Sequence, residues 1–291
     1  MSDLAPDLNP ADVRWARGGS TLLSRGQVIR HVARGREADL LAVGDPPVAM
    51  LKRWFAAGDH ASISDTVLRH LYPVIPVPRP LGWGWDRQGR SLLAMAPAGR
   101  VLSSVDVCGA AELGRLLARI HRHADPPADI PRDRTLRTLA ERLIPNGAPP
   151  ELHRLRDALV ALLPPAEGSA LCHGDFHPGN VLHGAAGMIV ADWAGARLSY
   201  PQYDLAWALV LLFVYYPAPL YPAFLEAYGA DAAVDDVAMF EALAALRWQY
   251  LARTAPVPIN EVWQQRAAVL LGSRLPESLR DLLPADPGPP R

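Results

Sequence analysis

Residues 171–193 read LCHGDFHPGNVLHGAAGMIVADW, and they decide the fold expected of this chain. The run GMIVAD predicts a strand that ends at Asp192. The run LCHGDFHPGNVL predicts two short strands around a tight loop that contains Pro and Gly. This arrangement brings the oxygen-bearing side chains of Asp175, Asn180 and Asp192 to one edge.

Two kinds of metal site compete for this segment. The oxygens of Asp and Asn suit Mg²⁺, which completes its octahedron with water and substrate phosphates. Sulfur and imidazole nitrogen suit zinc, so a metal-dependent hydrolase would use Cys172, His173, Asp175 and His177. Side chains of adjacent residues on a strand point to opposite faces, so Cys172 and His173 would hardly share one ion. We favour the oxygen-ligand site and keep the hydrolase as the lesser alternative.

The composition predicts a folded protein of two modest lobes. The 291 residues are 50% apolar and carry a formal net charge of −1, so no basic face is expected for binding nucleic acid. Two distant cysteines suit a reducing compartment, and no secretory leader is visible, which favours the cytoplasm. The uncharged run 205–225 is long enough for a bilayer, but three prolines in its second half indicate a buried core helix and no membrane span.

Lys52 is the only lysine among 29 basic residues. A compositional bias toward arginine usually replaces Lys by Arg at every position where any surface cation suffices. A compact, flexible ammonium is not equivalent to a guanidinium. The lone lysine therefore suggests chemistry, and a single surviving surface lysine is the plain alternative.

The pattern along the chain changes near residue 97. Residues 27–54 predict three strands, residues 62–72 a helix, and residues 80–96 a hairpin, which gives five strands and one helix in an N-terminal region 1–97. Region 98–291 is predicted to be mainly helical, with apolar spacing typical of helices at 109–124, 136–163, 205–216, 222–229, 236–253 and 260–274. The fold class is α+β, and the lone histidines His121, His123 and His183 are expected to be solvated.

The spacing His173-x-Asp175-x₄-Asn180, followed twelve residues later by Asp192-Trp193, resembles the catalytic loop and metal-binding Asp of kinase-type phosphotransferases. The wording HGDFHPGNVL…ADW…YDLAW, with ELGRLLARIHRH upstream, resembles the aminoglycoside phosphotransferase and choline kinase-like family over roughly residues 24–255. The resemblance implies a bilobal protein-kinase-like fold. It has a small antiparallel sheet with one helix in a nucleotide-binding lobe 1–97 and a larger catalytic helical lobe 98–291.

The resemblance also implies an ATP- and Mg²⁺-dependent kinase that phosphorylates a hydroxyl of a small molecule. Asp175 would accept or orient the proton of that hydroxyl. Asn180 and Asp192 would hold the metal ions that bridge the nucleotide phosphates. His173 would pack under the loop, and Asp204 would fix the loop backbone as a buried structural carboxylate.

The same resemblance assigns four residues to nucleotide binding. Lys52 would clamp the α- and β-phosphates, and Gly35 would let its turn approach them. Met95 lies in the stretch 93–97 that would form the hinge against adenine. Asp65 takes the place of the helix Glu that usually pairs with the lysine, although it is a shorter acid. This departure, with the missing G-x-G-x-x-G, keeps a nucleotide-binding pseudokinase as an alternative.

The acceptor is expected to be a small molecule. Only eleven residues separate Asp192 from Asp204, which is too short for an activation segment that also docks a peptide. Residues 198–291 hold ten acids and six Arg, with aromatic residues among them. Acids and aromatic faces could receive a cationic amine or amino alcohol, although most of these aromatics are expected to be core.

Overall fold

The computed structural model describes residues 8–23, 28–123, 125–163, 168–229 and 234–283. They divide into two compact units. The first comprises Met1–Ser103, Pro127–Ile130 and Gly179–Ala196, and the second comprises Ser104–Pro126, Pro131–Pro178 and Arg197–Arg291. The chain thus passes from the second unit to the first within the HPGN sequence of the loop.

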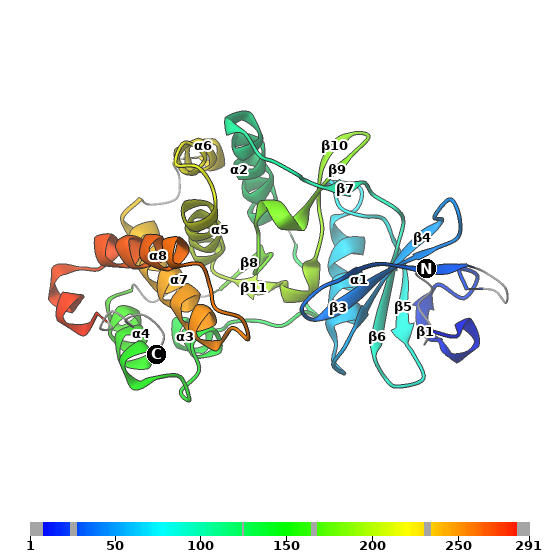
Figure 1. The fold of residues 1–291 in the computed structure, drawn as a ribbon, viewed down its shortest axis with the longest axis horizontal. Helices are drawn as coiled ribbons and strands as arrows, with labels where there is room; N and C mark the ends of the chain where they lie inside the picture. Colours follow the sequence, from blue (N-terminus) through cyan, green and yellow to red (C-terminus); the bar gives the residue numbers. More distant parts are fainter. Residues whose placement is uncertain (1–7, 24–27, 124, 164–167, 230–233, 284–291) are drawn as a thin grey trace. The chain divides into compact units, whose positions relative to one another are not determined.

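The first unit is built on a six-stranded antiparallel sheet (Figure 1), with strand order β1-β5-β6-β4-β3-β2. Its strands are β1 (Arg14–Gly18), β2 (Ile29–Arg34), β3 (Ala38–Val43), β4 (Ala49–Trp54), β5 (Pro80–Trp85) and β6 (Ser91–Met95). Apolar side chains of β3, β4 and β6 form the core of the sheet, with Leu41, Leu51 and Leu92 fully buried. Helix α1 (His60–Leu71) packs on β5 and β6.

The predicted meander, helix and hairpin of this unit are confirmed, but the expectation of five strands is wrong. The additional strand is β1, which pairs with β5 at the edge of the sheet. Four of its five side chains are exposed, so the sequence lacks the alternation that marks a half-buried strand.

A second, three-stranded sheet of the first unit contains two strands from the segment 171–193. It consists of β7 (Arg100–Val101), β9 (Val181–Gly184) and β10 (Gly187–Val190), in the order β10-β9-β7. Strands β9 and β10 form a hairpin. Its end brings Asn180 beside residues 191–192, because the Ala191 amide donates to the Asn180 carbonyl at 2.9 Å.

The second unit is mainly helical, as predicted. Its helices are α2 (Val107–His121), α3 (Leu136–Leu143), α4 (Pro150–Leu162), α5 (Pro201–Tyr215), α6 (Leu220–Tyr228), α7 (Val234–Thr254) and α8 (Glu261–Arg274). Two short strands, β8 (Ala170–Cys172) and β11 (Arg197–Ser199), pair antiparallel beside them.

Helix α5 is the central element of this unit. Most of its residues are buried, as expected for a helix that is apolar on every face. It packs against α6, α7 and α8 and ends at Tyr215, before the prolines. In the part of the chain that the structure describes, no helix combines the length and apolarity needed to cross a membrane.

Candidate active site

Lys52 and Asp192 form an ion pair in the first unit. The Lys52 Nζ lies 2.6 Å from Asp192 Oδ1, and it lies 5.0 Å from the centre of the Trp54 ring. The lysine comes from β4, whose register with β3 and β6 fixes the position of its backbone. Asp192 follows β10 in a left-handed conformation, with φ of 62°. Two residues far apart in sequence are thus joined by opposite charges.

A small pocket lies beside this pair in the first unit. It is lined by Lys52, Ser64, Leu68, Pro78, Leu93, Met95, Asp192 and Trp193. Three predicted site residues, Lys52, Met95 and Asp192, therefore line one apolar pocket with a charged end. This composition suits a flat apolar group next to an ionic one.

Asn180 and Asp192 flank the β9–β10 hairpin, where the Asn180 carbonyl accepts the Ala191 amide, and their role as metal ligands stays a prediction. The Asp192 carboxylate is 39% exposed, so it can take a further partner. In this structure the cation beside the Asp192 carboxylate is the ammonium group of Lys52. Hard oxygen donors of this kind fit Mg²⁺ rather than zinc.

Gly35 and Asp65 lie outside this pocket lining. Gly35 is in the β2–β3 turn, where its amide donates to the Ala38 carbonyl at 2.8 Å. Asp65 is fully buried on α1 and pairs with Arg69 at 2.8 Å and with Arg17 at 3.5 Å. Arg17 belongs to the unforeseen strand β1, so the sequence did not offer it as a partner. The role of Gly35 and the pairing of Asp65 with Lys52 stay predictions.

Asp175 lies in the second unit and is held by an indole. Trp207 Nε1 of α5 donates to Asp175 Oδ1 at 2.8 Å, and His177 Nε2 lies 3.7 Å from Oδ2. Burial alone would raise the pKa of Asp175, but the contacts with His177 and Trp207, with the charge of Arg247, lower it well below its usual range. These contacts favour the ionised carboxylate, whose two oxygens can both accept hydrogen bonds.

The loop before Asp175 is fixed by Asp204, as predicted. Asp204 is 1% exposed and accepts hydrogen bonds from the amides of His173 at 2.7 Å and Gly174 at 2.8 Å. His173 is fully buried, and its Nδ1 accepts the amide of Asp175 at 3.3 Å. The expected structural roles of Asp204 and His173 are confirmed.

His121 is the third partner of this carboxylate, and the expectation that it is solvated is wrong. Its side chain is 3% exposed. Nε2 lies 3.0 Å from Asp204 Oδ2, and Nδ1 lies 2.8 Å from the hydroxyl of Tyr228. The contacts cross 83 and 107 residues of sequence. In the sequence, the basic residues at the end of the predicted helix 109–124 did not indicate these contacts of His121.

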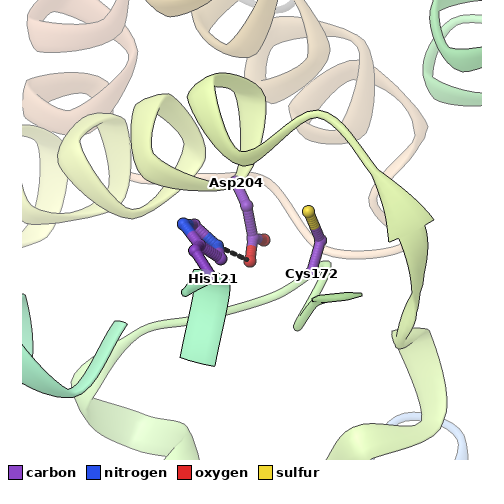
Figure 2. Close-up of side chains that lie close together, drawn as sticks. All are labelled: His121, Cys172 and Asp204. Atoms are coloured by element: carbon purple, nitrogen blue, oxygen red, sulfur yellow. Dashed lines mark hydrogen bonds and ion pairs between the residues drawn. The ribbon is translucent and has the colours of Figure 1, made fainter. Parts of the chain in front are cut away.

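Figure 2 shows His121, Cys172 and Asp204 together, with their ligand atoms within 4.8 Å of one another. The arrangement could suggest a metal site. However, both nitrogens of His121 and both oxygens of Asp204 already have hydrogen-bond partners. Burial, the largest effect, raises the pKa of Cys172 well above its usual range, so the metal-binding thiolate is disfavoured. We interpret the group as support for the loop.

Arg247 of α7 is a residue near Asp175 that the sequence analysis did not single out. Its guanidinium carbon lies 4.0 Å from the centre of the Trp207 ring. Its Nη1 lies 3.2 Å from the hydroxyl of Tyr203 and 3.5 Å from the carbonyl of Gly174. An arginine inside the apolar run EALAALRWQYL was the only sequence signal for it.

Comparison with known proteins gives one family. The sequence model described as the phosphotransferase enzyme family, APH, matches residues 29–248. No curated protein matches the chain significantly.

Solved structures with the same fold include three kinases of small molecules. Amicoumacin kinase hAmiN is 15% identical with a TM-score of 0.61, over 96% of this chain and 91% of that one. A choline/ethanolamine kinase family protein from Mesorhizobium loti is 18% identical with a TM-score of 0.58, over 87% and 90%. The macrolide 2'-phosphotransferase MphH from Brachybacterium faecium is 19% identical with a TM-score of 0.54, over 83% and 91%. The predicted protein-kinase-like α+β fold is confirmed.

Proposed function

The chain belongs to the phosphotransferase enzyme family, and from this premise we propose that it transfers the γ-phosphoryl group of ATP to a hydroxyl of a small molecule. The observation that carries the proposal is the pocket in which Lys52, Met95 and Asp192 meet. These three residues were expected from the sequence to bind nucleotide and metal. Structures with this fold include one of a kinase with AMP-PNP and Ca²⁺, which supports the choice of ATP.

In this mechanism Asp175 binds the acceptor hydroxyl. Its carboxylate is 49% exposed, so a hydroxyl can reach it. Trp207 fixes one carboxylate oxygen by its hydrogen bond, and the other can accept the proton of the acceptor. Because its pKa is lowered, Asp175 acts by orienting the hydroxyl and receiving its proton late in the transfer rather than by prior deprotonation.

The other residues hold the nucleotide. Asn180 and Asp192 would bind Mg²⁺, which when present neutralises charge on the β- and γ-phosphates. Lys52 would turn from Asp192 toward the phosphates, a motion that its flexible stem permits. Met95 and Leu93 offer the apolar surface of the pocket to the base.

A nucleotide-binding pseudokinase is the second candidate function. The pairing of Asp65 with Arg69 and Arg17 favours it, because these two arginines compete with Lys52 for its predicted acidic partner on α1. A zinc hydrolase that uses Cys172, His173, Asp175 and His177 is disfavoured, since burial raises the pKa of the Cys172 thiol and His173 Nδ1 already accepts the amide of Asp175.

The test is ADP formation from MgATP across a panel of alcohols, with AMP-PNP binding measured by calorimetry. Asp175→Asn is expected to abolish acceptor-dependent ADP formation and to keep AMP-PNP binding, while Lys52→Ala weakens both. Asp281→Asn, at an exposed position, is the matched control. AMP-PNP binding without any turnover would establish the pseudokinase. Stoichiometric zinc in the purified protein would contradict the kinase.

A further inference from the structure

Arg247 is a partly buried cation beside Asp175 that the proposed reaction leaves without a role. Its guanidinium stacks on the same indole that donates a hydrogen bond to the Asp175 carboxylate. It also contacts the carbonyl of Gly174, the residue directly before Asp175. The cation and the proposed base therefore lie on one small surface of the second unit.

The groups in direct contact with Arg247 are neutral, while its charge also acts on the nearby Asp175 carboxylate. Its contacts are a phenol hydroxyl, a backbone carbonyl and an indole face. Two other partly buried arginines of this unit are paired with acids, Arg142 with Asp133 at 2.7 Å and Arg274 with Glu241 at 2.6 Å, whereas Arg266 has neutral partners as Arg247 does. Within the described residues, no carboxylate lies within 4.0 Å of a nitrogen of Arg247. A partly desolvated charge is usually compensated by an opposite one. Asp175 acts on Arg247 only from beyond ion-pair distance, so the guanidinium can take an anion as a closer partner.

We propose that Arg247 binds an anionic group of the acceptor, which makes the acceptor a hydroxy acid with its hydroxyl within a few bonds of a carboxylate. This inference rests on the proposed function. Both hydrogen bonds of Arg247 use Nη1, which leaves the edge formed by Nη2 and Nε for a carboxylate. An arginine binds a carboxylate through two parallel hydrogen bonds.

The same geometry argues against the cationic acceptor expected from the composition. The face of Trp207 that would receive an ammonium group carries the guanidinium of Arg247. Two acids of region 198–291 do not compensate for this. Asp204 and Glu241 are 1% and 2% exposed and are bonded to protein groups. A substrate cation at Asp175 would meet a like charge.

An oxyanion beside Arg247 could also be the phosphoryl group in transfer. The two sources predict different behaviour. A contact with the phosphoryl group would be used with every acceptor, so its loss would lower all rates by the same factor. A contact with the acceptor would be used only by acids, so its loss would change the selectivity between acids and their neutral counterparts.

The experiment measures kcat and KM with MgATP for matched pairs of alcohols that differ by a carboxylate. The pairs are glycerate and glycerol, serine and ethanolamine, and gluconate and glucitol. We expect the acid of at least one pair to be the better acceptor. Arg247→Gln should reduce the ratio of kcat/KM between acid and partner by roughly tenfold to a hundredfold, the value of a hydrogen bond to a charged group, mainly through KM. Arg247→Lys should restore part of the ratio.

Arg253→Gln is the control, because Arg253 is on the same helix but pairs with Glu151 at 2.7 Å. It should leave the ratio unchanged, and thermal unfolding should show that all variants fold. A preference for the amines or neutral alcohols, no acceleration by any acid, or a uniform loss in Arg247→Gln would overturn the inference. Absence of ADP formation by the wild type under every condition would instead contradict the proposed function itself.

Discussion

The clearest test of how the loop is held is Asp204→Asn, because this change replaces one acceptor of a buried carboxylate by a donor. Asp204 Oδ2 accepts from the His173 amide and faces His121, and Oδ1 accepts from the Gly174 amide. In the variant at least one backbone N–H faces an NH₂ group and loses its acceptor. An unpaired buried donor costs about 1–3 kcal/mol.

Two further effects set the magnitude. The remaining hydrogen bonds lose their charge, which removes roughly another 1–2 kcal/mol. Burial opposes the ionised form of Asp204, although hydrogen bonds from His121 and the amide of His173 still lower its pKa, so removing the charge returns part of the desolvation cost. The expected net loss is about 2–4 kcal/mol. For a chain of this size that lowers the unfolding temperature by roughly 5–15 °C.

The assay is thermal unfolding followed by circular dichroism, with Asp281→Asn as an exposed control of the same chemistry. The control should change stability by less than about 0.5 kcal/mol. We also expect Asp204→Asn to slow ADP formation more than it weakens AMP-PNP binding, because Asp175 follows the released amides directly. If Asp204→Asn unfolds at the same temperature as Asp281→Asn, the reasoning about the clamped loop is refuted.

Three other predictions follow from packing, thiol chemistry and pH. Gly114→Ala should lower the stability by about 1–3 kcal/mol, since the new Cβ would lie 2.2 Å from a carbonyl oxygen of α6. In Gly272→Ala the new Cβ has open space, so this control should be neutral or stabilising. Equal unfolding temperatures of the two variants would contradict this prediction. With Ellman's reagent, the native protein should react at the exposed Cys108 but at the buried Cys172 only after unfolding, and two fast thiols would be the contrary result. Burial raises the pKa of Asp133, but contacts with arginines outweigh this effect and lower it. The ionised carboxylate therefore contributes its full stability above the unfolded pKa of about 3.9, and this contribution is lost as the pH falls through the folded pKa. Urea unfolding should show that the stability difference between the native protein and Asp133→Asn shrinks below about pH 4.

The sequence was most informative where local pattern and chemistry agree. The strands around the loop follow from apolar runs bounded by Pro and Gly, and the helices follow from their spacing. The structural role of Asp204 could be predicted because the resemblance assigned it, although its contacts with the loop amides join residues 30 and 31 positions apart. Lys52 stood out by composition, and the structure brings it to Asp192.

Contacts between distant elements could not be predicted in the same way. The pairing of His121 with Asp204 and Tyr228 depends on how α2 lies beside α5 and α6, which periodicity does not encode. Strand β1 has almost no buried face, but its partner β5 held a signal. Gly82 and Gly84 leave room for the β1 carbonyls, which a Cβ would approach to 2.4 and 2.1 Å. Alternate glycines in a strand can indicate such a close backbone neighbour.

Helix α5 contains the sequence YDLAW, and residues of this sequence contact the loop backbone, Asp175 and Arg247. Its burial on every side fixes its position, and its first turns then present three polar groups. Asp204 binds the loop backbone, Trp207 binds Asp175, and the Tyr203 hydroxyl contacts Arg247. Arg247 itself belongs to α7, so the helix that orients the proposed base is separate from the one that supplies the charge. A substitution on α7 could therefore change the preference for the charge of the acceptor without disturbing the hydrogen bonds that hold Asp175.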